Sequence, residues 1–412
     1  MASTSAGNAA PVVEPHSSVL SWDRARATAR DAGEALPAET RPLDGAPSQT
    51  APSQTALSHA LAAPLIARTD LPSFDTSAMD GWAVSGPGPW RLTGGEVLAG
   101  DAPSPLAAGD AVGIATGAPL PPGATSVLRR EHGRVDGERL ADLVGGRSDG
   151  QDVRPRGREC SQGEVLLPAG TTVTPAVLGM AAAAGYDRLE VHRRPSAELL
   201  VLGDELLSSG PPRDGRVRDA LSPMLVPWLQ GCADVVGCRR LPDELDALRE
   251  AISASTADVV ITTGSTAAGP VDHLHTALAE LGARLLVDSV AVRPGHPMLL
   301  AELPSGGRLV GLPGNPLAAV AGVVTLAMPL LDRLGGRSEV ENRTARAGDL
   351  LPHPGSTRLV PVLVRDGVAQ PLPFGGPAML RGLTLADGLA VLPPSEGPLP
   401  EGDVEVLPLP WG

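Results

Sequence analysis

The chain has 412 residues, of which 42% are hydrophobic and only 2% aromatic, and its formal net charge is −14. This length predicts several domains with aliphatic cores, and the charge argues against nucleic-acid binding through a basic surface. The three cysteines lack metal-site spacing and fit a reducing cytoplasm. No signal peptide is recognisable, and no apolar run reaches the roughly 18 residues of a membrane span.

The N-terminal part alternates between linker and helix patterns. Residues 1–15 are small and polar and are expected to be disordered. Amphipathic patterns predict helices over 20–33 and 56–67, and the direct repeat APSQTAPSQTA (46–56) between them is typical of a linker. Residues 70–150 are short runs punctuated by Gly and Pro, which indicate a small β-rich domain. Residues 151–195 return to an Arg-rich loop, a strand and an Ala-rich helix.

Residues 196–334 alternate apolar strands with helical patterns. Strands are expected at 197–203, 233–241, 257–264, 283–292 and within 308–316, and helices near 218–231, 243–253, 272–282 and 316–334. This alternation predicts a parallel sheet covered on both faces, whose ligands bind at the carboxyl ends of the strands. Residues 340–412 return to short strands and indicate a small β-domain of barrel type.

Acidic side chains follow three of these predicted strands, namely Asp204 and Glu205, Asp243 and Glu244, and Asp272. Carboxylates gathered at one edge of a sheet suit a hard divalent cation such as Mg²⁺, which bridges to phosphate oxygens. Any one of these acids alone fits helix N-capping better. Three at successive strand ends favour a ligand site.

Two loops in the same region suit anions. The segment VVITTGSTAAG (259–269) runs from a strand into a Gly/Thr loop, and LPGNP (312–316) is a tight turn that opens a helix. Pro316 suits the first helical position, and Gly314 lets the backbone approach an anion. The arginines of RPRG (154–157) fit a phosphate or carboxylate, although such a pair in a loop is more often solvated surface.

The segment FDTSAMDGWAV (74–84) places Asp75, Ser77 and Asp80 between two rare aromatic residues. A structured turn with Asp caps is the plain alternative. With the leucine, proline and serine before it, the segment resembles the signature of the molybdopterin molybdenumtransferases, the molybdenum-insertase family related to the C-terminal domain of gephyrin. Similar segments follow in family order at 115–127, 151–157, 168–175, 203–206, 257–264, 293–297, 311–316 and 383–393. The resemblance covers about residues 15–410.

This resemblance implies a multidomain α/β fold. Its central element is a three-layer α/β/α molybdopterin-binding domain over 196–335 with a parallel-rich sheet. An elongated domain (16–69 and 151–195) is split by the inserted β-rich domain (70–150), and a β-barrel domain covers 340–412. Also implied are a homodimer, Mg²⁺, adenylylated molybdopterin and molybdate as substrates, release of AMP, and recipient molybdoenzymes. No nucleic acid or membrane is expected as a partner.

The resemblance also implies site residues by motif. Catalytic roles fall on Asp80, Glu159, Glu205, Asp243 and Asp272, with Glu205 and Asp272 also holding metal. Substrate binding falls on Thr116, Arg154, Thr263, Gly264, Arg293, Pro313, Asn315 and Pro316. Glu159 stands where many members have an aspartate.

Several positions depart from the family pattern. Ser265 replaces a glycine where positive φ is expected, and Ala267 replaces a serine hydroxyl. Ser289 and His296 replace lysines; an imidazole of ordinary pKa is mostly neutral at pH 7. All 33 basic residues are arginine, so the composition of the chain explains why position 293 has an arginine where the family pattern has a lysine. Pro377 stands in a Gly-Ser-His type stretch and has no N–H to donate.

Two interpretations follow. The first is a working molybdenum insertase, supported by the retained acids and turns. The second is a divergent paralogue that binds molybdopterin or a protein partner with weak or no insertase activity, supported by the lost anion donors. A nucleotide-dependent enzyme that shares only the α/β domain is disfavoured, because the match runs beyond that domain. Tungsten in place of molybdenum stays open.

Overall fold

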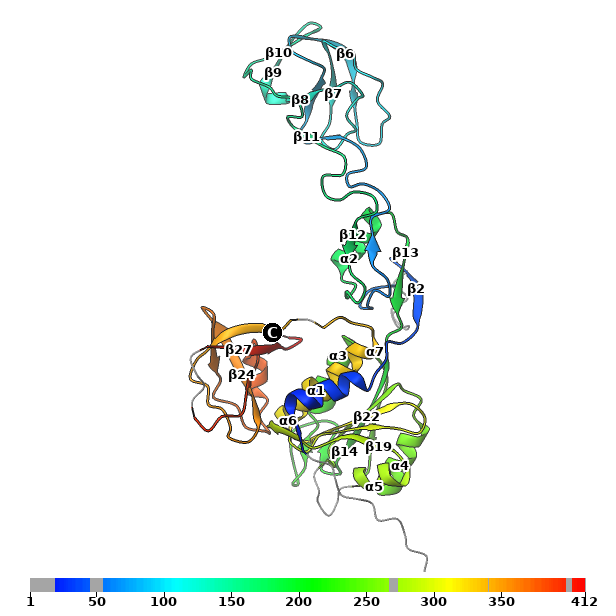
Figure 1. Ribbon diagram of the computed structural model, residues 1–412, viewed down its shortest axis with the longest axis vertical. Helices are drawn as coiled ribbons and strands as arrows, with labels where there is room; N and C mark the ends of the chain where they lie inside the picture. The colour runs from blue at the N-terminus through cyan, green and yellow to red at the C-terminus, as the bar shows by residue number, and fades with distance from the viewer. Residues whose placement is uncertain (1–18, 45–54, 267–272, 340, 398–401, 412) are drawn as a thin grey trace, which may run out of the picture. The chain divides into compact units, whose positions relative to one another are not determined.

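The computed structural model describes residues 19–44, 55–266, 273–339, 341–397 and 402–411. The chain forms two compact units, which Figure 1 shows in chain colours. The large unit comprises Met1–Glu39, Ser58–Ala60 and His192–Gly412, and the small unit comprises Thr40–Leu57 and Leu61–Val191.

A six-stranded sheet forms the centre of the large unit, in the order β17-β14-β18-β22-β21-β19. Its strands are β14 (Ser196–Leu202), β17 (Asp234–Leu241), β18 (Val259–Thr263), β19 (Arg284–Asp288), β21 (Leu299–Glu302) and β22 (Arg308–Leu312). β14, β17, β18 and β22 run parallel, whereas β21 runs antiparallel to both of its neighbours. The structure therefore confirms the predicted parallel-rich sheet.

Helices cover both faces of this sheet. Successive residues of a strand point to opposite faces, so an apolar strand presents side chains to be buried on each of them. One face packs against α1 (Trp22–Asp31), α3 (Leu221–Gln230), α6 (Pro316–Gly322) and α7 (Met328–Leu334), and the other against α4 (Leu245–Ala254) and α5 (Leu274–Glu280). Along β18, Ile261 joins the first core and Val260 the second. This arrangement is the predicted three-layer α/β/α domain.

The helical stretch Pro316–Leu334 is long and apolar enough to cross a membrane by length and composition alone. It is 83% buried inside the fold, as a core helix is. A π-helical segment (Val323–Ala327) joins α6 to α7, and its Thr325 hydroxyl accepts a hydrogen bond of 3.0 Å from the indole of Trp22.

The C-terminal part of the large unit is a closed five-stranded barrel, as predicted. The barrel strands are β23 (Arg343–Ala347), β24 (Thr357–Arg365), β25 (Val368–Pro371), β26 (Gly388–Leu392) and β27 (Asp403–Pro408), and pairing of β24 with β26 closes it. The short β1 (Leu20–Ser21) and β20 (Val290–Arg293) extend the same sheet beyond β24, and α8 (Arg381–Leu385) precedes β26.

Two expectations about local structure are wrong. Residues 283–292 do not form one strand: the backbone turns at Ser289, whose φ is +71°, so β19 and β20 enter different sheets. Residues 56–67 form turns and the short β3 (Leu65–Ile66) in place of a helix. Pro64 removes a helical donor, and Ser58 has a φ of +65°, which a helix does not accept.

The small unit is mostly β-structure. Its largest sheet has the order β8-β5-β7-β6-β10-β9, with β5 (Gly81–Val84), β6 (Trp90–Val97), β7 (Asp110–Ile114), β8 (Ser126–Arg129), β9 (Gly133–Asp136) and β10 (Arg139–Asp142). Shorter elements are β2 (Ala38–Pro42), β4 (Thr76–Ser77), β11 (Val153–Arg154), β12 (Val165–Leu167), α2 (Pro175–Ala183) and β13 (Arg188–His192). The Ala-rich helix predicted before residue 195 is α2, which Thr174 caps.

Candidate functional site

The loop after β18 and the turn after β22 meet at the carboxyl edge of the six-stranded sheet. The Gly264 N–H donates to the Leu312 carbonyl at 2.9 Å, and a Cβ added to Gly314 would lie 3.7 Å from the Gly264 Cα. Ser265 has a φ of +52°, so the left-handed conformation expected at this position is confirmed, and a side chain there is strained. The structure thus brings Thr263 and Gly264 beside Leu312 and Gly314, the residues on either side of Pro313.

The hydroxyls of Thr262 and Thr263 end β18 in a buried position, and within the described part of the chain neither has a hydrogen-bond partner. A buried hydroxyl without a partner costs about 1–3 kcal/mol, so this strand end has unused hydrogen-bonding capacity. Ala267 and the predicted metal ligand Asp272 lie outside the described residues.

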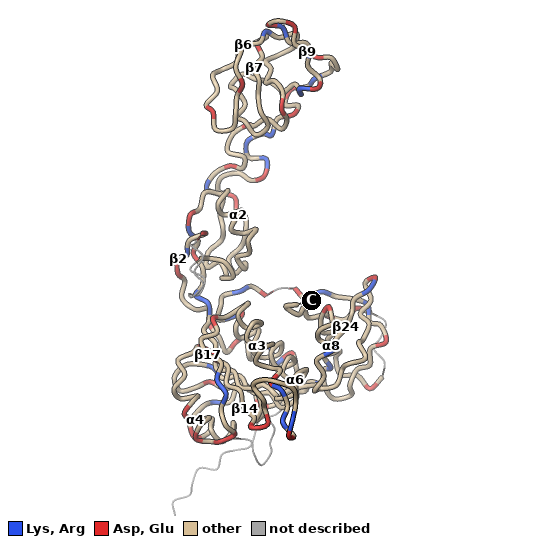
Figure 2. Tube along the Cα trace, turned by 180° about the vertical axis from the view of Figure 1, so that it is seen from behind, with Lys and Arg blue, Asp and Glu red and all other residues tan. Residues whose placement is uncertain are grey.

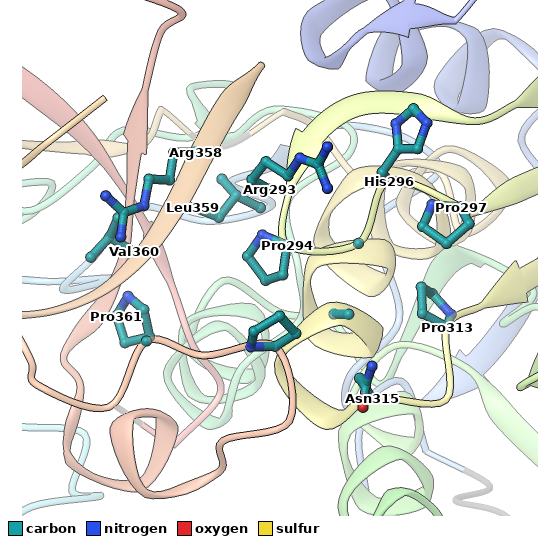
Figure 3. A pocket seen from close by; sticks show the side chains of 14 residues that line it. Arg293, Pro294, His296, Pro297, Pro313, Asn315, Arg358, Leu359, Val360 and Pro361 are labelled. Atoms are coloured by element: carbon teal, nitrogen blue, oxygen red, sulfur yellow. The ribbon is translucent and has the colours of Figure 1, made fainter. Parts of the chain in front are cut away.

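A pocket of about 310 Å³ opens between the α/β domain and the barrel, within the large unit (Figure 3). Arg293, His296 and Asn315 line it from the α/β side, and Arg358 and Pro377 line it from the barrel side. Its 14 lining residues include two arginines and no Asp or Glu. In a chain of net charge −14, such a pocket favours an anion.

The RPGHP turn that carries Arg293 and His296 is packed tightly on α6. Gly295 has a φ of +103°, and a Cβ there would lie 2.9 Å from the Ala318 carbonyl oxygen. Glycine is therefore required at this position. The imidazole Nδ1 of His296 lies 2.7 Å from the Val290 carbonyl oxygen, so Nδ1 carries a proton and only Nε2 is left for a ligand.

The start of α6 is already capped from the barrel. The Pro377 carbonyl accepts hydrogen bonds from the N–H groups of Leu317, at 2.9 Å, and Ala318, at 3.3 Å. Asn315 occupies the N-cap position, but its side chain makes no capping hydrogen bond. Asn315 thus lines the pocket without capping α6, and the two helix amides are engaged by the Pro377 carbonyl.

Asp204, which follows β14, and Asp243, which follows β17, lie beside each other. The backbone N–H of Asp204 donates to the Asp243 carboxylate at 3.3 Å, and Glu205 is exposed next to it. Within the described ranges no three His, Cys, Asp or Glu side chains form a cluster. Mg²⁺ in phosphate sites is commonly held by one or two carboxylates, waters and the phosphate itself. The exposed Glu205 and the half-buried Asp243 carry carboxylates of the type this ion takes.

In the small unit, the structure joins two predicted residues directly. The Asp80 carboxylate accepts a hydrogen bond of 2.7 Å from the backbone N–H of Thr116. This backbone hydrogen bond and the Thr116 hydroxyl hold the pKa of Asp80 below its usual range. Asp80 is therefore an anion that ties the AMDG loop to the ATGAP loop.

The RPRG loop folds onto acids of its own unit through Arg156. The Arg156 N–H donates to Asp75 at 2.7 Å, and its guanidinium bonds to Asp70, whose pKa the Gln162 N–H and Arg156 lower. The predicted ligand Arg154 is exposed on β11, in register with Thr76 of β4. Glu159 is also exposed, and its N–H donates to the Leu71 carbonyl at 2.8 Å.

The predicted site residues thus fall into two groups, one in each unit. Asp80, Thr116, Arg154 and Glu159 belong to the small unit, and the other described ones belong to the large unit. Figure 2 shows acidic and basic segments interspersed over both. Sequence analysis missed Arg358, because an arginine in a β-strand carries no local signal of a pocket; only the pairing of β20 with β24 reveals it.

The fold and this site define a multidomain protein with an α/β domain of the molybdopterin-binding type. Family models match the MoeA N-terminal region (domain I and II) at residues 20–185, a probable molybdopterin binding domain at 198–333 and the MoeA C-terminal region (domain IV) at 344–409. The chain is 32% identical to the molybdopterin molybdenumtransferase of Nostoc sp. over 376 residues, which cover 85% of this chain and 86% of the relative. It therefore belongs to the molybdopterin molybdenumtransferase family.

Further comparisons agree with this assignment. The molybdopterin molybdenumtransferase of Synechococcus elongatus is 31% identical over 85% of this chain and 91% of its own length. A crystal structure of the molybdopterin biosynthesis MoeA protein from Pyrococcus horikoshii matches with a TM-score of 0.75 at 22% identity, over 94% of this chain and 99% of that chain. That likeness supports the fold.

Proposed function

We propose that this protein is a cytoplasmic molybdopterin molybdenumtransferase that inserts molybdenum from molybdate into adenylylated molybdopterin and releases AMP. One observation carries the proposal: the joined loops after β18 and β22 lie beside a pocket whose lining has two arginines and no acid. A phosphate on the loops and an oxyanion in the pocket would then be neighbours. This neighbourhood is what the transfer requires.

Different residues hold different parts of the substrates, according to the hydrogen-bond donors that they carry. The Thr263 hydroxyl, which has no partner among the described residues, holds a phosphate oxygen, and Arg293 with the Asn315 amide holds molybdate. Gly264, whose N–H donates to the Leu312 carbonyl, stays assigned to substrate binding by the family pattern alone. Asp80 keeps the Thr116 loop in place through its hydrogen bond of 2.7 Å. Arg154 and Glu159, both exposed, stay assigned to substrate binding and catalysis by the family pattern alone.

Mg²⁺ would be held by Glu205 and Asp243 at the strand ends, with Asp272 as a further ligand. When bound, the ion supplies charge neutralisation at the phosphate oxygens as AMP departs. Asp243 would lose less conformational freedom than an unrestrained carboxylate on binding the ion, since the Asp204 N–H already holds it at 3.3 Å.

The direct test of this assignment is AMP release by Asp272→Asn. We expect the variant to lose AMP release, while Asp246→Asn, which changes an exposed acid on α4, retains it. Unchanged AMP release in Asp272→Asn would reduce Asp272 to a helix cap.

Complementation tests the whole reaction. The gene is expressed in cells that lack their insertase, and a molybdoenzyme activity is measured at ordinary and at high molybdate. We expect rescue at ordinary molybdate. Rescue at neither concentration would overturn the proposed function.

The second candidate is a divergent paralogue that binds molybdopterin or a protein partner and inserts metal poorly. Its specific support is the Pro377 carbonyl, which engages the Leu317 and Ala318 amides, together with the strained Ser265. Rescue only at high molybdate would favour weakened oxyanion binding.

We further propose that the protein is a homodimer that passes its product to molybdoenzymes, with no nucleic acid or membrane as a partner. Light scattering of the purified chain measures the dimer.

A further inference from the structure

The helix that forms one wall of the pocket between the α/β domain and the barrel is irregular. Asn315, at the N-cap of α6, and Ala318 line the pocket. The helix continues through the π-helical segment into α7, whose second residue is Pro329. A π-helical segment adds one residue to an α-helix, and each residue rotates a helix by about 100°. The position of this segment therefore fixes which residues of α6 face the pocket.

Pro329 leaves one backbone carbonyl of this helix without its regular donor. The Met328 N–H donates to the Val323 carbonyl, five residues earlier, as in a π-helix. In the same pattern residue 329 would donate to the Val324 carbonyl, but proline has no N–H. Val324 is only 5% exposed, and a buried carbonyl without a partner is destabilising. The Val324 carbonyl therefore needs a donor from outside the helix.

Arg26 of α1 supplies that donor. Its guanidinium Nη1–H donates to the Val324 carbonyl. One turn earlier on α1, the Trp22 indole N–H donates to the Thr325 hydroxyl at 3.0 Å. The guanidinium also lies over the Trp22 ring, 4.8 Å from its centroid, and this contact helps to hold it in place. Two side chains from one face of α1 thus bind two successive residues of the π-helical segment.

This contact is costly for a charged side chain. Arg26 makes no ion pair within the described ranges of the chain, and burial lowers the pKa of its guanidinium. An apolar side chain would pack at this position without desolvating a charge. It would not donate to the Val324 carbonyl, and this donation is what the arginine adds.

The start of α6 tolerates little rotation. The Pro377 carbonyl accepts hydrogen bonds from the Leu317 and Ala318 N–H groups, at 2.9 and 3.3 Å. A Cβ on Gly295 of the RPGHP turn would lie 2.9 Å from the Ala318 carbonyl oxygen. A rotation of α6 would therefore break the two hydrogen bonds and displace Asn315 from its place in the pocket lining.

We propose that Arg26 is a positioning residue, which replaces the N–H that Pro329 lacks and so holds α6 in the rotation that places Asn315 at the pocket. Without Arg26, the Val324 carbonyl gains a donor only if the π-helical segment moves along the helix, and that movement turns α6. Arg26 acts from α1 and does not itself line the pocket. The inference rests on the proposed function for the identity of the anion, molybdate, but not for the geometry.

Hydrogen–deuterium exchange of the purified full-length chain tests the proposal without a ligand. Arg26→Met keeps a long side chain but removes its donors, and Arg24→Met, which changes an exposed arginine on the same helix, is the matched control. We expect Arg26→Met to speed exchange at the Leu317 and Ala318 amides by at least about tenfold, because their hydrogen bonds open. We expect the control to change it by less than about twofold. Exchange in α4 stays within about twofold of wild type in both variants, which separates a turn of α6 from global unfolding.

Pro329→Ala shows whether Arg26 acts through the Val324 carbonyl. Alanine restores an N–H at residue 329, so this carbonyl has a second donor. In the Pro329→Ala background we expect Arg26→Met to change exchange at Leu317 and Ala318 by less than about twofold. An equal increase in both backgrounds, or no increase in the wild-type background, would overturn the proposal. If Arg26→Met melts early, Arg26→Lys, which keeps a donor on a shorter side chain, takes its place. We then expect a smaller increase that Pro329→Ala again removes.

Two kinetic constants separate this inference from the proposed function. In AMP release from adenylylated molybdopterin, we expect Arg26→Met to raise the KM for molybdate by at least about fivefold, because a displaced pocket wall weakens binding. We expect kcat to change by less than about twofold. An unchanged KM would overturn the link between Arg26 and the pocket. Absence of AMP release in the wild-type protein would contradict the insertase, and the exchange experiment would still decide the role of Arg26.

Discussion

The carboxylate of Asp80 accepts a hydrogen bond of 2.7 Å from the backbone N–H of Thr116, 36 residues further along the chain. This bond joins two segments that both match the family motifs. Asp80→Asn keeps an oxygen that accepts the same hydrogen bond but removes the charge, whereas Asp80→Ala removes both. We expect Asp80→Ala to lose AMP release by at least about tenfold and Asp80→Asn to lose much less, because the contribution is positional. Equal losses in the two variants would assign the role to the charge.

Gly295→Ala is expected to destabilise the large unit by at least about 2 kcal/mol, since the new methyl group meets a packed helix. Its Cβ would lie 2.9 Å from the Ala318 oxygen and 3.1 Å from the Ala321 Cβ. Gly306→Ala is the matched control, because Gly306 also has a positive φ, +89°, but has open space around it. Urea unfolding of both variants measures the difference. Equal losses would mean that backbone conformation alone sets the cost.

Ser265→Gly is expected to leave stability unchanged or raise it by up to about 1 kcal/mol, because glycine relieves the left-handed backbone but is more flexible when unfolded. Ser253→Gly on the exposed face of α4 serves as the control and should lose about 0.5 kcal/mol through helix propensity. Both values come from urea unfolding. If Ser265→Gly lowered the free energy of unfolding as much as Ser253→Gly does, the backbone at Ser265 would not be strained.

Stability of the large unit is expected to fall as the pH drops below about 4, the range in which a carboxyl group with an ordinary pKa takes up a proton. Burial raises the pKa of Asp258, but hydrogen bonds from Arg193 and Ser196 outweigh it and hold that pKa below its usual range. The folded state therefore binds this proton less readily than the unfolded state. The resulting stability is complete above the ordinary pKa and is lost as the pH falls through the lower folded pKa.

Asp258→Asn checks this dependence. We expect the variant to be less stable than wild type at pH 7 and the gap to narrow toward pH 3, as urea unfolding at a series of pH values would record. Asp349→Asn changes an exposed aspartate and should leave the pH profile unchanged. A constant gap between Asp258→Asn and wild type at all pH values would contradict the assignment.

One of the three cysteines is expected to react rapidly with a thiol reagent in the folded protein at pH 8. Cys238 is exposed, whereas burial raises the pKa of Cys160 and raises that of Cys232 to about 11. Ellman's reagent should therefore show one fast thiol in the native chain and three in guanidinium chloride. Cys238→Ser should remove the fast phase, and a fast phase that survives would point to opening around Cys160 or Cys232.

Much of the architecture could be predicted from local pattern. The apolar, β-branched run 259–261 leads into Thr262, Thr263 and Gly264, so both the buried β18 and the loop after it follow from composition and spacing. The positive φ at Ser265 could be predicted because the family pattern has glycine there. The first prediction rests on neighbouring residues and the second on the family pattern.

The rest depends on contacts between residues far apart in the chain. The single strand expected at 283–292 is in fact two, because the Ser289 and Val290 N–H groups donate to the Met298 and His296 carbonyls. Beyond this turn, β20 pairs with β1 and β24, which are distant in the sequence. The Pro377 carbonyl at the start of α6 could not be predicted either. The sequence shows that Pro377 has no N–H to donate. Which N–H groups its carbonyl accepts from depends on how the barrel packs against α6.

The placement of β20 has a consequence for how this protein can evolve and be engineered. The strand belongs by sequence to the α/β domain and by hydrogen bonding to the sheet of the barrel. A chimera joined near residue 340 would therefore supply β24 with an edge partner from a different parent. The barrel therefore cannot be replaced by that of another protein without also changing its strand partner β20. A substitution on β20 must be compatible with the residues of β24, and the reverse, because the two strands pair with each other. The two domains are therefore expected to change together at the strands that carry Arg293 and Arg358.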